Sequence, residues 1–326
     1  MCWKKISSMK LTNVLIILLI SSSAVLAQPF PSVEENIPYL VTFGGDGETS
    51  WGDDDFTQIF FFSIPKSHKD PVYIRVFDPG TGGEIDEAKG EFNTTTKFSV
   101  YGGTGCITNK AARSQTPSGE YKSGNLLASK TFVDEMDGEW YSFGPFNPTS
   151  GELSSNYGGY VIKFICEGVS GNDGNLYKYY LSTSPTENKK IQGGNAFTFE
   201  YTFRLNEDAN EISHIYPYVD SSVISIKQSN FDYDSDGDIK ITTAARLAIH
   251  LTMSGNDVWM HGEHKILQKE KETSFDIQFV KRKEDPIKRN NVTFYVTNQY
   301  GDALPFWSVP IGGVPKPTTT IKVIPK

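Results

Sequence analysis

The chain has 326 residues, of which 31 are lysine or arginine and 39 are aspartate or glutamate, so its formal net charge is −8. An acidic surface repels nucleic acids and anionic membranes, which excludes both as expected partners. Aromatic residues make up 13% of the chain and glycines number 29, a composition typical of β-strands separated by tight turns.

The first 27 residues have the features of an export signal. Lys4, Lys5 and Lys10 precede an apolar run at 14–20, and a small-x-small pattern ends at Ala27. Because this run is too short to cross about 30 Å of hydrocarbon, we expect cleavage after Ala27 rather than a membrane anchor. No later segment is long and apolar enough to span a bilayer. Cleavage would leave 28 basic against 39 acidic residues in a secreted protein, whether extracellular, at the cell surface or periplasmic.

Two cysteines, Cys106 and Cys166, remain after the signal is removed. In an oxidising compartment two cysteines predict one disulfide. It would close a loop of about 60 residues and contribute roughly 4 kcal/mol on the chain-entropy view. The alternative is a pair of buried free thiols.

Strand patterns dominate the first two thirds of the mature chain. Along 196–205 every second residue from Phe197 to Leu205 is apolar and most residues between are polar, which predicts a strand with one buried face. The other runs rich in β-branched and aromatic residues lie at 56–64, 71–77, 97–101, 125–132, 139–143, 160–166 and 175–182.

Strand patterns continue at 223–227, 239–253, 257–260, 274–280 and 291–297. The odd positions from 239 to 253 are apolar except for Thr243, and the even positions are polar except for Ala244 and Ala248, which predicts one long strand. A helix over 243–251 is the alternative.

The predicted fold class is therefore all-β, with two β-sandwich domains of jelly-roll or immunoglobulin type in tandem. We expect an N-terminal domain at 28–208, a C-terminal domain at 213–312 and an extended tail at 313–326. The polar stretch 182–195 is the alternative boundary.

The densest group of carboxylate side chains is the acidic run at residues 232–239. Asp232, Asp234, Asp236 and Asp238 alternate along it, and Gly237 stands where a tight loop must turn. Oxygen ligands at this density suit a hard cation, most of all Ca²⁺. A solvated acidic turn is the alternative.

This run resembles the first half of the D-x-D-x-D-G calcium loop of EF-hands, dockerins and thrombospondin type 3 repeats. The resemblance covers eight residues and implies side-chain ligands at Asp232, Asp234 and Asp236, with Asp238 at the position of the carbonyl ligand. Thr243 stands where those loops carry a bidentate acid. We expect a structural Ca²⁺ site between strands, with the missing ligand supplied from elsewhere or by water.

A second acidic group lies in the glycine-rich stretch at 46–55, where a solvated turn is the expected structure and a calcium site the alternative. Its members are Asp46, Glu48, Asp53, Asp54 and Asp55. His261 and His264 lack the spacing of a zinc motif. No G-x-S-x-G elbow or CxxC motif is present, so no catalytic residue and no organic cofactor is predicted.

Aromatic side chains could form a sugar-binding platform, although most rings in a β-sandwich pack in its core. The candidates are Trp140, Tyr141, Tyr157, Tyr160, Tyr177, Tyr179 and Tyr180. The first domain also resembles the pre-peptidase C-terminal type of secreted β-sandwich at 60–64, 71–78 and 159–164, which implies an accessory module that binds calcium or matrix.

The sequence thus predicts an exported, calcium-stabilised, non-enzymatic protein that binds a protein or glycan at the cell surface or matrix, in adhesion or envelope assembly. A carbohydrate-binding module is the first alternative. A secreted glycoside hydrolase or hydrolase accessory protein is the second.

Overall fold

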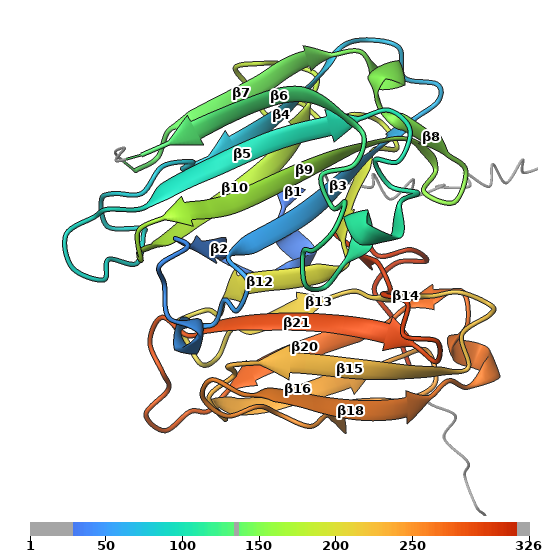
Figure 1. Ribbon diagram of the computed structural model, residues 1–326. Coiled ribbons are helices and arrows are strands. Elements are labelled where there is room, and N and C mark those ends of the chain that lie inside the picture. The colour runs from blue at the N-terminus through green and yellow to red at the C-terminus, as the bar shows by residue number, and fades with distance from the viewer. Residues whose placement is uncertain (1–28, 134–136, 318–326) are drawn as a thin grey trace, which may run out of the picture.

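The computed structural model describes residues 29–133 and 137–317, so the predicted export signal and most of the expected tail lie outside the described residues. The fold is all-β, as predicted, and every strand pairing is antiparallel. Figure 1 shows two stacked β-layered halves, with β3 to β10 in the upper half and β15 to β21 in the lower.

The largest sheet runs through both halves in the order β18-β15-β21-β12-β2-β10-β4-β7, with β1 beside β10. Its strands are β18 (Trp259–Lys265), β15 (Ser225–Phe231), β21 (Asn291–Asn298), β12 (Glu200–Arg204), β2 (Tyr39–Phe43), β10 (Gly174–Ser182), β4 (Val72–Phe77), β7 (Trp140–Phe146) and β1 (Pro29–Phe30). This sheet crosses the expected boundary at 208–213, because β12 pairs with both β2 and β21.

Two further sheets pack against this one. The upper half has the order β22-β11-β3-β9-β5-β6, with β8 beside β9, and the lower half has β13-β20-β16-β17. Their strands are β22 (Phe306–Trp307), β11 (Asn195–Thr198), β3 (Thr57–Pro65), β9 (Gly159–Ser170), β5 (Thr95–Gly102), β6 (Asn125–Phe132), β8 (Glu152–Ser154), β13 (Ile212–Ile215), β20 (Asp276–Lys281), β16 (Gly237–Thr242) and β17 (Ile249–His250).

The remaining elements are short. They are the pair β14 (Tyr218–Val219) and β19 (Thr273–Ser274), and the 3-10 turns η1 (Val33–Glu35), η2 (Thr49–Trp51), η3 (Lys110–Arg113), η4 (Pro148–Ser150) and η5 (Gln268–Glu270). No helix in the described part of the chain is long and apolar enough to cross a membrane.

One aromatic-rich core joins the sheets of both halves. In the upper half Tyr179 of β10 contacts Phe60 of β3 and Phe164 of β9, each with ring centroids 4.9 Å apart. In the lower half Phe279 of β20 contacts Phe203 and Phe294 of the long sheet at 5.1 and 5.4 Å. All six rings belong to a single buried cluster.

The expected strand at 196–205 is two strands in two sheets. β11 pairs with β3 and β22, whereas β12 pairs with β2 and β21. The break falls at Phe199, where the Thr198 hydroxyl donates to the carbonyls of Ile59 and Glu200. Phe197 and Phe199 therefore pack in a separate cluster, while the later odd residues enter the main core.

The expected long strand at 239–253 is a hairpin. β16 ends at Thr242, a turn follows, and β17 returns beside it with Ile249 opposite Ile241. The turn closes through the Thr243 amide, which donates to the Arg246 carbonyl, and Ala248 has a left-handed φ of 50°. Neither the continuous strand nor the helix over 243–251 was a correct prediction.

The predicted disulfide between Cys106 and Cys166 is wrong, because both thiols are free and buried. Cys166 lies on β9 with its side chain in the main core. The Cys106 thiol instead donates to the carbonyl of Val161, whose side chain lies in the cluster on the other face of the same sheet. The two sulfurs are thus on opposite faces of the sheet.

We therefore expect the protein that begins at residue 28 to show two thiols by Ellman titration in denaturant without reductant. Burial raises the pKa of both thiols to about 12, so neither should react in the native protein at neutral pH. A denatured sample with no reactive thiol would contradict the structure.

Candidate functional site

The acidic run at 232–239 forms a tight turn between β15 and β16. Asp232, Asp234 and Ser235 have left-handed φ angles of 56°, 58° and 52°. Gly237 has a φ of 131°, and a Cβ at this position would lie 2.0 Å from the Val280 carbonyl oxygen. The sharp turn expected at Gly237 is therefore required by the backbone.

Asp236 is the centre of this turn and is fully buried. Its carboxylate lies 3.6 Å from the Lys281 Nζ and 3.1 Å from the Arg282 Nε, and it accepts hydrogen bonds from the Ile287 amide and the Asn290 side chain. Two cations therefore neutralise the charge that a metal ion would otherwise neutralise. Asp236 is buried, whereas Ser235 is exposed and Asp234 and Asp238 are part exposed, so water reaches only part of this turn.

The other three aspartates of the run point to different partners. Asp238 pairs on the sheet surface with Lys240 and His250, at 3.5 and 3.2 Å. Asp232 accepts from the Asp257 amide at 2.6 Å, and burial raises the pKa of its carboxyl to about 7. Partial burial and the nearby Asp236 carboxylate also raise the pKa of Asp234.

These donors do not fit a Ca²⁺ centre as they are arranged. Among the described residues, no three side chains of histidine, cysteine, aspartate or glutamate lie together as ligands for one ion. Thr243, which stands at the twelfth position of the resemblance, is buried and donates to Glu270 at 2.6 Å. The loop is therefore held by ion pairs and hydrogen bonds of this chain.

Asp236→Asn should lower the free energy of unfolding by about 2 kcal/mol, because it removes a carboxylate that is hydrogen-bonded to charged groups. Excess Ca²⁺ or EDTA should leave the melting temperature unchanged. Asp238→Asn is the matched control and should cost less than about 1 kcal/mol, since its ion pairs are exposed. A Ca²⁺-dependent rise in melting temperature that is lost in Asp236→Asn would contradict this account.

The second acidic group comes together only in part, because Asp53, Asp54 and Asp55 are electrostatic neighbours but have separate hydrogen-bond partners. Asp46 accepts from the Gly171 amide, Asp54 from the Trp259 indole, and Asp53 from the amides of Phe43 and Phe56. Asp55 instead lies beside Glu200 of β12, close enough for a side-chain hydrogen bond, and each carboxyl has a buried oxygen without another partner. Two carboxyls can share such a bond only if one is protonated.

The pH dependence of stability follows from these buried acids. Burial raises the pKa of Asp53 to about 7, and burial together with neighbouring carboxylates raises the pKa of Asp55 and Glu200 well above the usual range. Such acids bind their protons more tightly in the folded chain than in the unfolded chain. Their contribution to the free energy of unfolding is therefore complete below about pH 4 and is lost as the pH rises through the folded pKa.

We therefore expect urea unfolding to give a lower free energy at pH 8 than at pH 5. Each tenfold difference in proton affinity between the folded and unfolded chain is worth about 1.4 kcal/mol. Glu200→Gln should flatten this dependence, because the amide stays neutral at both pH values. An identical decrease in the variant and the natural protein would show that the Asp55–Glu200 pair is not responsible.

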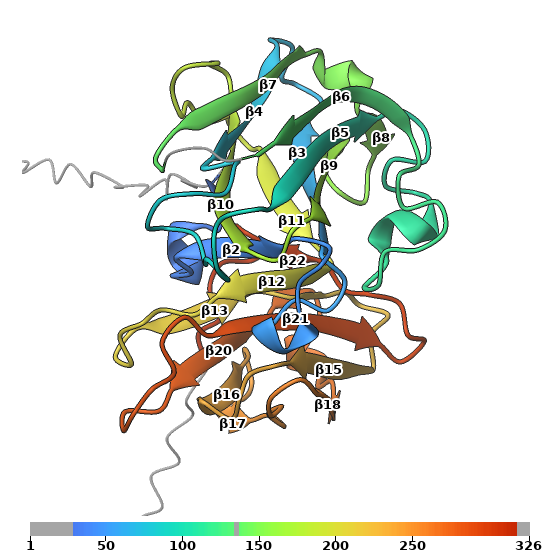
Figure 2. The same ribbon diagram turned by 60° about the vertical axis from the view of Figure 1, so that its left-hand side comes forward.

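A cleft of about 910 Å³ lies between the upper and lower halves. Its wall comes from segments far apart in the sequence, near β3, η3, β9, β11, β14, β21 and β22, and Figure 2 shows β11 and β22 beside each other where the halves meet. The aromatic members of the wall are Tyr157, Tyr218 and Trp307, and the polar ones include Lys110, Arg113 and Asn195.

The aromatic side of the cleft is a stack of rings. Tyr157 lies flat on Phe197, with centroids 4.7 Å apart and planes 6° from parallel, and Trp307 lies 4.5 Å from the same phenylalanine. The Ser63 hydroxyl donates to the Tyr157 carbonyl and fixes the turn that carries the tyrosine. Tyr157 remains part exposed, so the cleft has a rigid aromatic wall on a packed base.

Only one of the predicted platform residues, Tyr157, lines this cleft. Tyr177 and Tyr179 are fully buried in the core, and Trp140 lies on β7 with the Arg75 guanidinium 4.7 Å above its ring. Sequence reasoning missed Tyr218 and Trp307, because only the pairing of β22 with β11 brings Trp307 beside Tyr157. No local pattern around Phe306–Trp307 signals this.

No known protein family matches the chain, and a search of curated proteins found none with a similar sequence.

Proposed function

We propose that the protein is an exported, non-enzymatic binding protein that takes a glycan in the cleft between its halves, in adhesion or matrix binding. The observation that carries the proposal is the aromatic wall of Tyr157 and Trp307 beside side-chain amides and hydroxyls. Sugar rings stack their apolar faces on aromatic rings and place hydroxyls on polar groups, so this combination suits them. A rigid wall also avoids the cost of ordering side chains on binding.

Two carboxylates, Asp220 and Asp302, also line the cleft and favour glycoside hydrolysis as the second candidate. Hydrolysis needs one carboxyl that keeps its proton, which burial normally provides. Both aspartates are exposed, however, and each is engaged, Asp302 with Lys110 at 3.4 Å and Asp220 with the amide and hydroxyl of Ser222. Binding without cleavage is therefore the function we favour.

A glycan array probed with the labelled protein tests the proposal, followed by calorimetry on each glycan that is retained. We expect retention of at least one glycan class, with no release of reducing sugar on prolonged incubation. Release of reducing sugar would favour the hydrolase. Retention of no glycan at millimolar concentrations would contradict glycan binding.

A further inference from the structure

Arg113 is a cation without a carboxylate partner on the wall of the cleft. It ends the η3 turn, and none of the ion pairs among the described residues includes it. Its guanidinium forms a hydrogen bond with the Tyr157 hydroxyl and lies 6.0 Å from the Phe199 ring, while its Nε is buried without a hydrogen-bond partner. Glu200 lines the small cavity on the other side of Arg113, but its carboxyl is bonded to Asp55.

A buried guanidinium nitrogen without an acceptor is costly, because the hydrogen bond it made to water in the unfolded chain is not replaced. A ligand that carries an anionic oxygen would supply that acceptor. Arginine presents its donors in a planar fork that matches the two oxygens of a carboxylate or sulfate.

Trp307 adds a second unpaired donor beside the same cleft. Its side chain is only 6% exposed, and its Nε1 is buried with no partner among the described residues. An indole nitrogen can only donate a hydrogen bond. The Arg113 Nε and the Trp307 Nε1 therefore both lack a hydrogen-bond acceptor. A ligand with hydroxyl and anionic groups offers many acceptor oxygens.

Lys110 places another positive charge at the mouth of the cleft. It lies three residues before Arg113 in η3 and contacts Asp302 at 3.4 Å, with 84% of its side chain and 53% of that of Asp302 exposed. An ion pair this exposed contributes little and exchanges readily for another partner. Asp220 also lines the cleft, and its carboxylate accepts two hydrogen bonds from Ser222. These bonds reduce its electrostatic repulsion of a bound anion.

We propose that the cleft is selective for acidic glycans, with a carboxylate or sulfate of the sugar bound by Arg113, attracted by Lys110, and its ring stacked beside Tyr157. The Trp307 Nε1 donates to an oxygen of the same sugar. This proposal rests on the proposed glycan binding and adds the charge class of the ligand.

Calorimetry with tetragalacturonate and its methyl ester tests the charge directly, because the ester keeps the sugar rings and removes the carboxylates. A sulfated tetrasaccharide and its desulfated form make the second pair. We expect the acidic member of at least one pair to bind about tenfold more tightly than its neutral partner, as one charge-assisted hydrogen bond allows. Raising the salt concentration should reduce this preference.

Arg113→Gln should abolish the preference for the acidic member. Because Arg113→Gln also removes a bond to Tyr157, the melting temperature of this variant is measured as a check on folding. Lys110→Gln, at an exposed position, is the second variant and should reduce the preference for the acidic member in part. Lys269→Gln removes an equal charge at an exposed position of η5 and should change neither the affinity nor the preference.

Equal binding of the acidic and neutral members of both pairs, or an unchanged preference in both Arg113→Gln and Lys110→Gln, would overturn the proposed selectivity. Binding of neutral glycans alone would also overturn it and leave the proposed function standing. Retention of no glycan of either charge would instead contradict the proposed function itself.

Discussion

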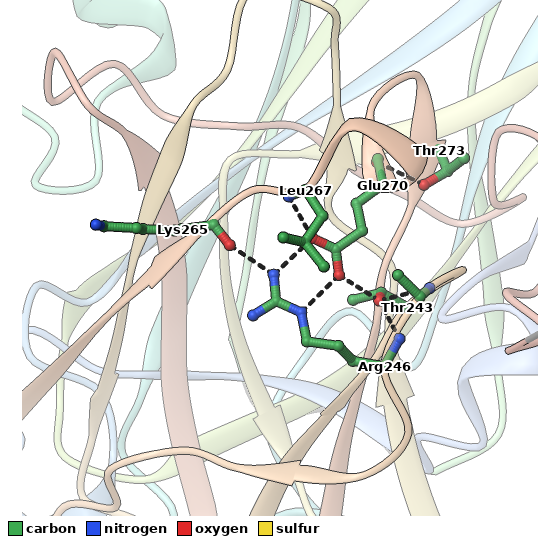
Figure 3. Close-up of polar contacts among 7 residues, drawn as sticks. Thr243, Arg246, Lys265, Leu267, Glu270 and Thr273 are labelled. Carbon is green, nitrogen blue, oxygen red and sulfur yellow. Dashed lines mark hydrogen bonds and ion pairs between the residues drawn. The ribbon is translucent and has the colours of Figure 1, made fainter.

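Glu270→Ala is expected to lower the free energy of unfolding by about 3 to 5 kcal/mol, the cost of removing one partner from a buried ion pair. The Glu270 side chain is fully buried and lies at the centre of the network in Figure 3. It accepts from the Thr243 hydroxyl at 2.6 Å, from the Arg246 Nε at 2.7 Å and from the Leu267 amide at 2.7 Å.

The loss is large because several groups lose their acceptor together. The Thr243 hydroxyl and the Leu267 amide would be left without it, and the Arg246 guanidinium would keep only its bond to the Lys265 carbonyl. This network ties the 243–248 turn to η5, so we expect the β16–β17 hairpin to loosen as well. Arg246→Ala should be nearly as destabilising, since it leaves the Glu270 charge buried and unpaired.

Urea unfolding followed by fluorescence measures the change. Glu263→Ala is the matched control, because Glu263 lies exposed on the neighbouring strand β18, and it should shift stability by less than about 0.5 kcal/mol. If Glu270→Ala is no less stable than this control, the network does not hold the lower half together.

Tyr157→Ala should weaken the binding of a retained glycan by about 2 kcal/mol, or roughly thirtyfold, the loss typical of an aromatic residue at the centre of a binding site. The ring is the part-exposed member of the stack with Phe197 and Trp307, so its removal takes away the platform and leaves the packed base. Tyr157→Phe keeps the ring and should retain most of the affinity for a neutral glycan.

Calorimetry on the natural protein and both variants checks this result, with melting temperatures to confirm folding. Trp140→Ala is the matched control, because it removes an exposed aromatic ring on β7 that does not line the cleft. Equal affinity in Tyr157→Ala and Trp140→Ala would place the glycan elsewhere on the protein.

The all-β class was predictable because period-two alternation and aromatic runs are local features of the chain. The course of the strands was not. The alternation at 196–205 is real, but its first half enters one sheet and its second half another, since the Thr198 hydroxyl bonds to Ile59, a residue 139 positions away. The alternation at 239–253 likewise gives way to a turn, which Glu270 holds from outside the pattern.

The candidate sites show the same limit. The spacing of Asp232, Asp234 and Asp236 is that of a calcium loop, but the cations beside Asp236 come from Lys281 and Arg282, which no local pattern connects to it. Only some residues of the cleft wall were predictable from the sequence. Tyr157 was a candidate ring, whereas Arg113 and Trp307 reach it only through the packing of the two halves.

The most direct test of glycan binding in the cleft is a two-dimensional NMR spectrum of protein with 15N-labelled tryptophan, recorded with and without a retained glycan. The Trp307 indole signal, assigned with Trp307→Phe, reports on a side chain of the cleft wall whose buried Nε1 has no partner among the described residues. We predict that this signal shifts on titration while that of Trp140 stays in place. A glycan that binds and shifts the Trp140 signal, with Trp307 unchanged, would contradict the proposed site.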